Sequence, residues 1–335
     1  MKATAIGDLA QTFMLQQRST QLRASMLRLT QEMSTGIVSD VQSRLGGDFA
    51  KLSGLEHRMT IMDGLRVANT EAAGFTEAAQ MRLGRVTDTA GELGNSLLAL
   101  AASPGTGVVS GSADRAAAAL EDAVHELNAK FAGRALFAGV STDSAPLIDA
   151  GAILDELRVV AAGAGTAAAA ITAVGTWFND PAGFEATAYQ GSTTDLQPFA
   201  INEDRSIPYE LRADDPAVRA ALRDMAAAAL VTDPALGLSG AEQAQLVSDI
   251  GESLLVVQDD LIGLSANLGV TQEMIERASV RQETERLALE DARNTLLAAD
   301  PFETATELEA VQFRLESLYA VTVRSSQLSL VNFLR

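Results

Sequence analysis

The chain contains no cysteine among its 335 residues. Disulfides, thiolate metal sites and cysteine nucleophiles are therefore excluded, and the chain suits either redox compartment. The only histidines are His57 and His125, so most metal sites and catalytic triads lack their usual ligand or base. Aromatic residues make up 4% of the chain. The core is therefore predicted to consist of Ala, Leu, Val, Ile and Met, a composition suited to long, closely packed helices.

Basic residues are scarce as well. There are 25 Lys and Arg against 44 Asp and Glu, and the formal net charge is −19. An acidic chain without a basic run repels both nucleic acid and anionic lipid surfaces. No apolar run approaches the roughly 18 residues of a transmembrane helix, and Met1–Ala10 lacks the apolar stretch of a secretory signal. We expect no nucleic-acid partner, no membrane insertion and no cleaved signal peptide, so a secreted form needs another export route.

The short motifs that resemble chemical sites are incomplete. His125-Glu126 begins like the helix of a zinc protease, but Ala129 stands where the second histidine ligand is required. The Gly105–Gly107 segment lacks the preceding strand and the following Lys of a phosphate-binding loop. Two acidic pairs, Asp214-Asp215 and Asp259-Asp260, are adjacent in sequence and would diverge on a helix. We predict no catalytic, cofactor-binding or metal site and no enzymatic activity.

Apolar residues at both ends of the chain follow the alternating spacing of three and four that is typical of coiled coils. The N-terminal stripe stops at Gly36, a residue that can end a helix in the left-handed conformation. The C-terminal stripe follows Pro301. The N-terminal stripe consists of Leu15, Ser19, Leu22, Met26, Leu29 and Met33, and the C-terminal one of Leu308, Val311, Leu315, Leu318 and Thr322.

Three further stripes indicate longer helices in the interior. One runs from Ile61 to Leu100, in a helix of roughly 50 residues and so about 75 Å long. Another runs from Ala113 to Ala135. A third runs from Leu246 to Leu268 and is followed by a charged helix over Thr271–Leu297. No compact enzyme domain needs a helix of 75 Å, so the spacing favours a rod.

Residues 140–215 differ in composition from their surroundings. They hold four of the eight prolines and the single tryptophan. The runs Gln197–Ile201 and Ile207–Leu211 flank a polar turn and predict a β-hairpin, and the Ala-rich segment Leu154–Val174 predicts a helix. The fold class is therefore mainly α: a long antiparallel helical, coiled-coil rod built from both chain ends, with an inserted small α+β domain. The predicted domains are 1–40 plus 304–335, 41–139 plus 216–303, and 140–215.

Charge separates the ends from the middle. Residues 1–40 contain four basic and three acidic residues, and residues 304–335 contain three of each. The ends therefore sum to +1 and the middle to −19 − 1 = −20. Single helices far from a central core bury little unless they pair with each other or with other copies. The pattern favours self-association through nearly uncharged amphipathic ends.

Short segments spread in order along the chain carry a further signal. Glu32–Gly36 (EMSTG) resembles the STG-containing segment near the start of the bacterial flagellin family. Asn128–Gly139 (NAKFAGRALFAG) looks like the "N…G.ylFgG" stretch of that family's hook–filament junction protein, also called the third hook-associated protein. Tyr189–Ser192 (YQGS) is similar to its "Y.Gd" segment and Ser326–Leu334 (SQLSLVNFL) to its "SLl.yL" ending. Gly269 and Ala299–Ala305 resemble two more of its segments.

This resemblance implies a structural axial component of the flagellum, an adaptor between hook and filament. Such proteins are exported unfolded by the flagellar type III apparatus without a cleaved signal. Their ends are disordered in the monomer and fold into a coiled coil on assembly, while an inserted domain faces outward. The implied partners are further copies in a ring or helical oligomer, another hook-associated protein on the hook side, flagellin on the filament side and a cytoplasmic export chaperone. No cofactor is implied.

The predicted assembly interface combines the terminal stripes with the C-terminal ending. It consists of Leu15, Leu22, Met26, Leu29, Met33, Leu308, Val311, Leu315, Leu318, Leu328, Leu330 and Leu334.

Two alternatives to the junction protein stay open. The turn after Gly36 lacks the family's "PSDDP"-like sequence and has Val41–Asp48 instead, which keeps flagellin itself as an alternative. The chain length, the Phe137–Gly139 stretch and the Leu328–Leu334 ending favour the junction protein. Outside the family, a long-helix signalling or interaction module has the same periodicity, but it would not need nearly uncharged apolar ends.

Overall fold

A computed structural model describes the chain except for residues 1, 102–105, 203 and 334–335. The expected mainly α fold is confirmed, since 74% of the chain is helical. In chain order the elements are α1 (Lys2–Thr35), α2 (Val41–Arg44), α3 (Ala50–Ala101), α4 (Thr106–Leu127), β1 (Lys130–Phe131), β2 (Arg134–Ala135), α5 (Ala150–Val160), α6 (Ala167–Asn179), α7 (Phe184–Thr187), β3 (Leu196–Asn202), β4 (Arg205–Tyr209), α8 (Pro216–Ala229), the 3₁₀ helix η1 (Pro234–Leu236), α9 (Gly240–Leu297) and α10 (Pro301–Phe333).

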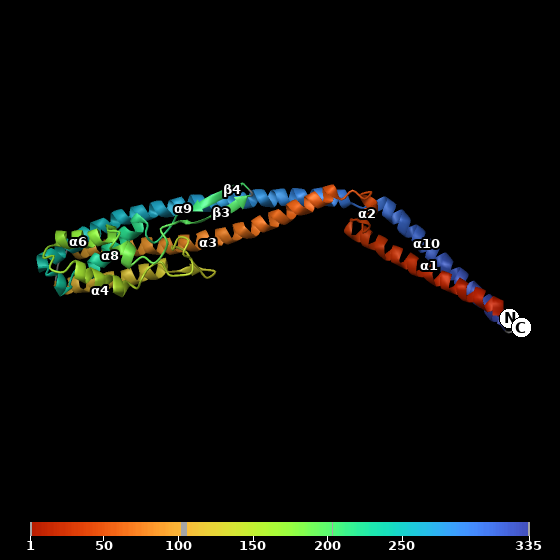
Figure 1. Ribbon diagram of the computed structural model, residues 1–335, viewed down its shortest axis with the longest axis horizontal. Helices are drawn as coiled ribbons and strands as arrows, with labels where there is room; N and C mark the ends of the chain where they lie inside the picture. Colours follow the sequence, from red (N-terminus) through yellow and green to blue (C-terminus); the bar gives the residue numbers. More distant parts are fainter. Residues whose placement is uncertain (1, 102–105, 203, 334–335) are drawn as a thin grey trace. The chain divides into compact units, whose positions relative to one another are not determined.

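The chain forms two compact units. The terminal unit comprises Met1–Met62 and Thr284–Arg335, and the central unit comprises Asp63–Glu283. The long helices α3 and α9 each contribute residues to both units (Figure 1).

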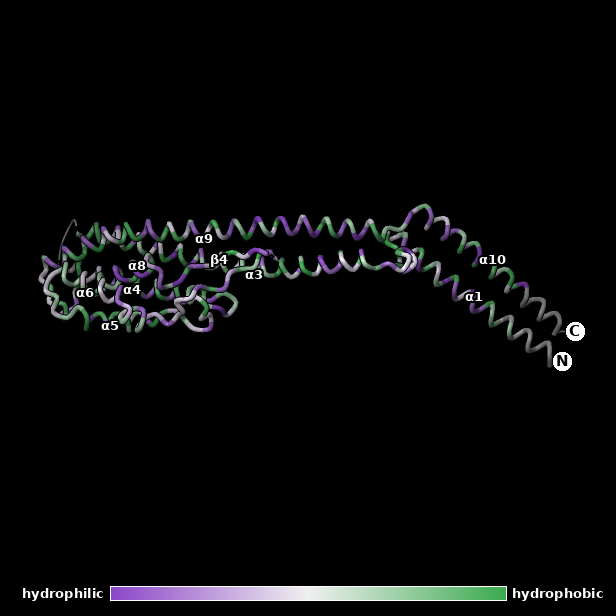
Figure 2. Tube along the Cα trace, turned by 45° about the horizontal axis from the view of Figure 1, so that its top comes forward, coloured by the Kyte–Doolittle hydropathy of each residue, from purple (hydrophilic) through white to green (hydrophobic). Residues whose placement is uncertain are grey.

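The central unit has one extended hydrophobic core. It draws on α3 and α9, on α4 and α8, and on the segment between α4 and α8. Most of its buried side chains are Ala, Leu, Val and Ile, as the composition predicts, and Figure 2 shows hydrophobic residues throughout these helices. The few aromatic residues are concentrated rather than dispersed. Trp177, Phe178, Phe184 and Tyr189 form one cluster of rings, and Phe75, Phe131, Phe199 and Tyr209 form another. Residues 140–215 thus share their core with the long helices.

The predicted hairpin is confirmed as the antiparallel pair β3–β4. Its inward-facing Ile201 and Ile207 pack with Ala72 of α3 and with Ile275 and Ala278 of α9, forming a second, smaller core. Glu203, in the predicted turn, lies outside the described residues. The hairpin therefore lies along the α3–α9 pair of the central unit and is held there by apolar contacts.

Two predicted helices end in other places than the spacing indicates. The helix expected to reach Ala135 stops at Leu127, because Ala132 and Gly133 adopt positive φ angles of 49° and 82° and turn the chain into the β1–β2 pair. The helix expected over Leu154–Val174 is divided into α5 and α6. Gly163 and Gly165, both at φ 70°, interrupt it.

Other helix boundaries agree with the sequence. Gly36 has φ 70° and follows the last residue of α1. Pro216 begins α8, where the Asp215 side chain accepts a hydrogen bond from the backbone N–H of Ala217 at 3.0 Å.

One helix of the described chain, α9, passes a length and composition test for a membrane span. Its most apolar 18-residue window has a mean hydropathy of 1.2. Core helices of soluble proteins pass the same test. Leu246, Ile250, Leu254 and Leu261 of α9 are buried in the core of the central unit, and the adjacent Asp259 and Asp260 are exposed. Part of the apolar surface of α9 is therefore used inside the protein, while Val256, Ile262 and Val270 of the same helix are exposed.

Candidate assembly surfaces

The terminal helices α1 and α10 lie side by side (Figures 1 and 2). They are antiparallel, because Arg23 contacts Tyr319 whereas Ile37, further along the chain, pairs with Ala298. The two apolar stripes explain the pairing, because each helix has one apolar side that is removed from water when the two helices pack together.

The predicted stripe residues mostly face the partner helix. Leu29 and Val311 are buried, and six others of the predicted set are half-buried: Leu15, Leu22 and Met26 on α1, and Leu308, Leu315 and Leu318 on α10. The side chains of Leu328 and Leu330, and all of Leu334, lie outside the described residues. Most of the described stripe side chains are only half-buried. A single α1–α10 pair therefore does not fully cover its own apolar stripes.

The N-terminal stripe drifts in its last turn. Met33, which continues the heptad spacing, is exposed, and Glu32 takes the buried position instead. A straight helix rotates by about 20° per heptad relative to a perfect seven-residue repeat, which is about 50° over the two to three heptads of this stripe, so the last stripe position is no longer centred on the contact. Within one chain Met33 is uncovered, and its place in the assembly interface stays a prediction.

Polar contacts hold the end of the pair where α1 and α10 join the rest of the terminal unit. The Glu32 carboxylate accepts a hydrogen bond from the backbone N–H of Ser39 at 2.8 Å and pairs with Arg28 at 3.0 Å. The backbone N–H of Val38 donates to the carbonyl of Leu297 at 2.9 Å, and that of Ala299 donates to Gly36 at 2.8 Å. These bonds tie the segment after α1 to the segment before α10.

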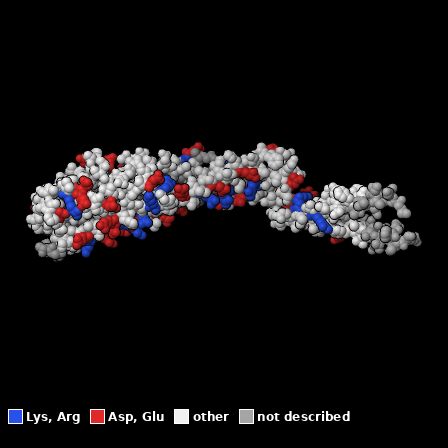
Figure 3. Space-filling view, turned by 60° about the horizontal axis from the view of Figure 1, so that its bottom comes forward, with Lys and Arg blue, Asp and Glu red and all other residues white. Residues whose placement is uncertain are grey.

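Further along the pair, a guanidinium joins the two helices. Arg23 donates to the Tyr319 hydroxyl from Nε at 3.0 Å and from Nη2 at 2.7 Å. The hydrogen bond from Arg23 lowers the pKa of the Tyr319 phenol. Figure 3 shows mostly uncharged atoms over the described part of this helix pair, with acidic and basic side chains interspersed along the central unit.

Exposed apolar side chains on the side of each helix away from its stripe were not part of the sequence prediction. Phe13 and Leu27 of α1 are 67% and 68% exposed, and Phe302 and Phe313 of α10 are 84% and 71% exposed. Phe13 and Leu27 are two heptads apart, and Phe302 and Phe313 are three turns apart, so each pair lies on one side of its helix. This spacing is the signal that could have revealed the face. Large apolar side chains held in water in this way indicate a surface that is covered on association.

We expect α1 and α10 to be the first parts of the isolated monomer to be cut by a protease. Among their described apolar side chains only Leu29 and Val311 are buried, whereas the central unit has a continuous core. A helix pair with so little burial opens at a low free-energy cost. Limited trypsin digestion followed by mass spectrometry measures this. Cleavage within 63–135 as early as at Arg18, Arg23 and Arg314 would contradict the prediction.

The central unit contains an ion-pair cluster around a buried glutamate. Glu126 of α4 accepts hydrogen bonds from Arg82 at 2.8 Å and from Arg85 at 3.0 Å, both on α3. Burial alone would raise the pKa of the Glu126 carboxyl, but the two arginines outweigh it and lower that pKa below 4.5. The neighbouring His125, the residue of the incomplete zinc motif, is exposed. The motif's glutamate thus joins two helices.

Replacing Glu126 by Gln should lower the free energy of unfolding at neutral pH by about 1–3 kcal/mol, because two guanidinium groups lose their charged partner. A carboxyl whose folded pKa is lowered stabilises the fold above its unfolded pKa, and that contribution is lost as the pH falls through the folded value. The difference between the two proteins should therefore shrink below about pH 4.5. Urea unfolding at pH 7 and near pH 3 measures it. The exposed Glu121→Gln on the same helix is the control, and an equal loss in both variants would contradict the assignment.

The other acidic residues noted in the sequence lie at exposed positions or at the end of a helix. Asp259 and Asp260 are exposed and adjacent on α9, and Asp215 caps α8. Burial, with Asp214 nearby, raises the pKa of Asp215. Cavities of about 310 and 440 Å³ lie beside α9 and share Asp215, Leu264 and Asn267. Among the described residues, no group of three or more His, Cys, Asp or Glu could hold a metal ion.

Comparison with known proteins gives a fold relationship. No family model matches the chain, and no curated protein matches it. A solved structure from Vibrio parahaemolyticus, described as that of a "putative flagellar hook-associated protein", superposes with a TM-score of 0.52. The match covers 75% of this chain and 99% of that chain at 12% sequence identity. At this identity the likeness shows a shared fold.

Proposed function

We propose that this protein is a structural, non-enzymatic component of the bacterial flagellum, and that it acts as an adaptor at the junction between hook and filament. The observation that carries the proposal is the antiparallel pair of terminal helices. Its inner stripe is half-covered and its outer face exposes large apolar side chains, as expected of a subunit that is completed by its neighbours. The fold shared with a hook-associated protein supports the same role.

The proposed partners follow from this role. Further copies of the chain would pack through α1 and α10 in a ring or helical oligomer. Another hook-associated protein would lie on the hook side and flagellin on the filament side, with an export chaperone bound before secretion. The proposed location is extracellular, after export without a cleaved signal peptide. The absence of cysteine supports passage of an unfolded chain through a narrow channel, since no cross-link can form on the way.

Deleting the gene and imaging the cells by electron microscopy tests the role. Intact hooks without filaments, with flagellin shed into the medium, are the expected result. Shortened or altered filaments on normal hooks would instead identify a filament subunit. Unchanged flagella and motility would overturn the flagellar proposal altogether. Re-expression of the full chain should restore filaments in the first case.

A further inference from the structure

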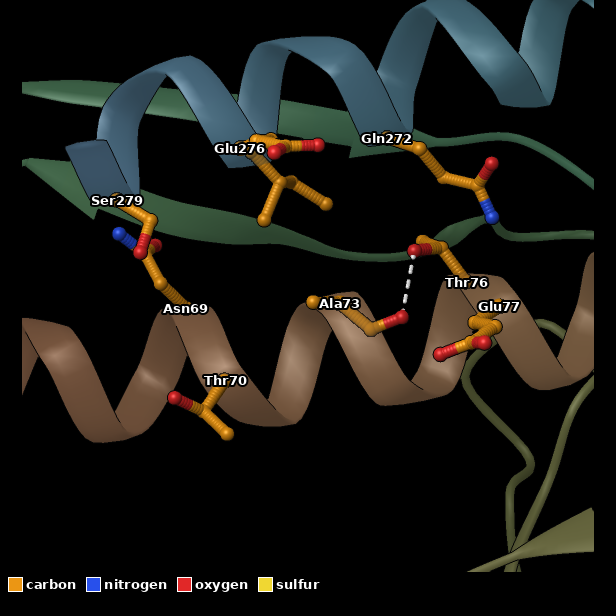
Figure 4. A pocket seen from close by; sticks show the side chains of 9 residues that line it. Asn69, Thr70, Ala73, Thr76, Glu77, Gln272, Glu276 and Ser279 are labelled. Carbon is orange, nitrogen blue, oxygen red and sulfur yellow. Dashed lines mark hydrogen bonds between the residues drawn. The ribbon is translucent and has the colours of Figure 1, made fainter.

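A groove of about 470 Å³ lies between α3 and α9 of the central unit (Figure 4). The close-up shows side chains from both helices along it, with the β3–β4 hairpin behind. The groove is lined by Asn69, Thr70, Ala73, Thr76 and Glu77 of α3 and by Gln272, Ile275, Glu276 and Ser279 of α9.

One lining residue has a buried acceptor without a partner. Asn69 is 2% exposed, and its Nδ2 donates to Oε1 of Gln282 at 2.7 Å, but its Oδ1 accepts no hydrogen bond. An unmade hydrogen bond at a buried oxygen is unfavourable, and a donor from a ligand would remove that cost.

The orientation of this amide is determined by its neighbours. The Nε2 of Gln282 donates to the backbone carbonyl of Ile201, which can only accept. The Oε1 of Gln282 therefore points to Asn69 and accepts a hydrogen bond, and the Nδ2 of Asn69 is the donor. Exchanging the two atoms of the Asn69 amide would place two oxygens against each other, so Oδ1 remains the free atom.

The rest of the groove also offers acceptors. The Thr76 hydroxyl is buried and donates its proton to the carbonyl of Ala72 at 2.9 Å, so the accessible acceptors are the carboxylates. The carboxylates of Glu77 and Glu276, one on each helix, are exposed and add two negative charges. Ile275 is buried and Ala73 adds a methyl group, so the groove has an apolar part as well.

We propose that this groove binds the arginine side chain of a partner protein. A guanidinium carries five N–H donors in a planar fork and a permanent positive charge, which complements Asn69 Oδ1 and the two carboxylates. Its methylene stem matches the methyl group of Ala73, which is exposed. A bare metal ion fits less well, since the described residues gather no group of three His, Cys, Asp or Glu. The chemistry of the groove does not depend on the proposed flagellar role.

The test uses the full chain, labelled with ¹⁵N at the side-chain amides of Asn and Gln, and N-acetyl-arginine methylamide as the probe. We expect saturable shifts of the Asn69 and Gln272 amide signals at millimolar probe. The citrulline analogue, which has nearly the same shape without the charge, should bind about tenfold more weakly or worse. No saturable shift, or equal affinity for the citrulline probe, would overturn the proposal.

Three variants keep the result interpretable. Glu77→Gln with Glu276→Gln removes the two charges and should weaken arginine binding about tenfold, since partly exposed ion pairs are individually modest. Glu121→Gln with Glu156→Gln removes two exposed charges elsewhere in the central unit and should change nothing. Ala73→Leu fills the groove from an exposed helical position, preserves the charges and should abolish binding. Wild-type affinity in the first or the third variant would overturn the proposal.

Discussion

Replacing Gly139 by Ala is expected to lower the free energy of unfolding of the central unit by about 3 kcal/mol or more. Gly139 has φ 60°, a conformation that L side chains adopt at a cost. An added Cβ would lie 2.4 Å from the carbonyl oxygen of Thr194 and 2.6 Å from that of Ser192. Both neighbours are backbone atoms, so no side-chain rotation relieves the contact.

The surrounding backbone has little freedom to move away. Thr194 accepts a hydrogen bond from the N–H of Val140 at 3.1 Å, and Ser192 donates to Ala138 at 2.9 Å. Phe137, just before, is fully buried, and its carbonyl accepts from Ala213 at 2.9 Å. A shift that accommodates a methyl group at Gly139 must therefore break bonds that join three segments of the chain.

Gly133→Ala is the matched control. Gly133 also has a positive φ of 82°, but no atom lies within 4 Å of the position that an added Cβ would take. The change there should cost only the conformational strain, about 1–2 kcal/mol. Urea unfolding followed by circular dichroism measures both variants. Equal losses at the two positions would show that contact with Thr194 and Ser192 does not matter.

The long helices could be predicted from the sequence because their apolar spacing extends over many turns. α3 and α9 repeat the pattern so often that one irregular step does not obscure it. The end of α4 could not be found in this way. Phe131 continues the helical spacing, yet it lies in the short strand β1, and its ring packs against Phe75, 6.3 Å away between centroids. Its burial depends on Phe75, which is far away in the sequence. Apolar spacing alone does not distinguish a residue of a helix from a residue that is buried by such a distant contact.

The surface formed by α1 and α10 could be predicted in part, because its apolar spacing also repeats over several turns. The stripes containing Leu29 and Leu315 are visible as heptads and lie at or near the helix contact. The burial of Glu32 is not visible, because a glutamate beside a stripe has the character of a solvent-facing residue. The pair with Arg28 has the i,i+4 spacing of a helix, but the N–H of Ser39 reaches Glu32 only because the chain turns after Gly36. The unpartnered Oδ1 of Asn69 could not be predicted either, because the orientation of this amide depends on Gln282, more than 200 positions away.

Leu315→Asp should abolish incorporation of the protein into the assembled structure while leaving the central unit folded. Leu315 is half-buried in the stripe of α10 that faces α1. Covering a leucine stabilises by roughly 1.5–3 kcal/mol, and a carboxylate in its place adds the cost of losing its hydration. The α1–α10 pair has few buried apolar side chains, so a loss of this size is expected to open it. The core of the central unit contains no residue of α10.

Gln312→Glu provides the comparison, because it adds the same charge on the same helix at an exposed position. It should assemble like the wild type. Circular dichroism of the purified proteins should show the same cooperative unfolding of the central unit in both variants. Motility and antibody labelling of hook tips then report incorporation in cells. If Leu315→Asp incorporates normally, the inner stripe of α10 is not an assembly surface. The outer face with Phe302 and Phe313 would then be the remaining surface of that helix able to carry subunit contacts, and charge substitutions there would be the next measurement.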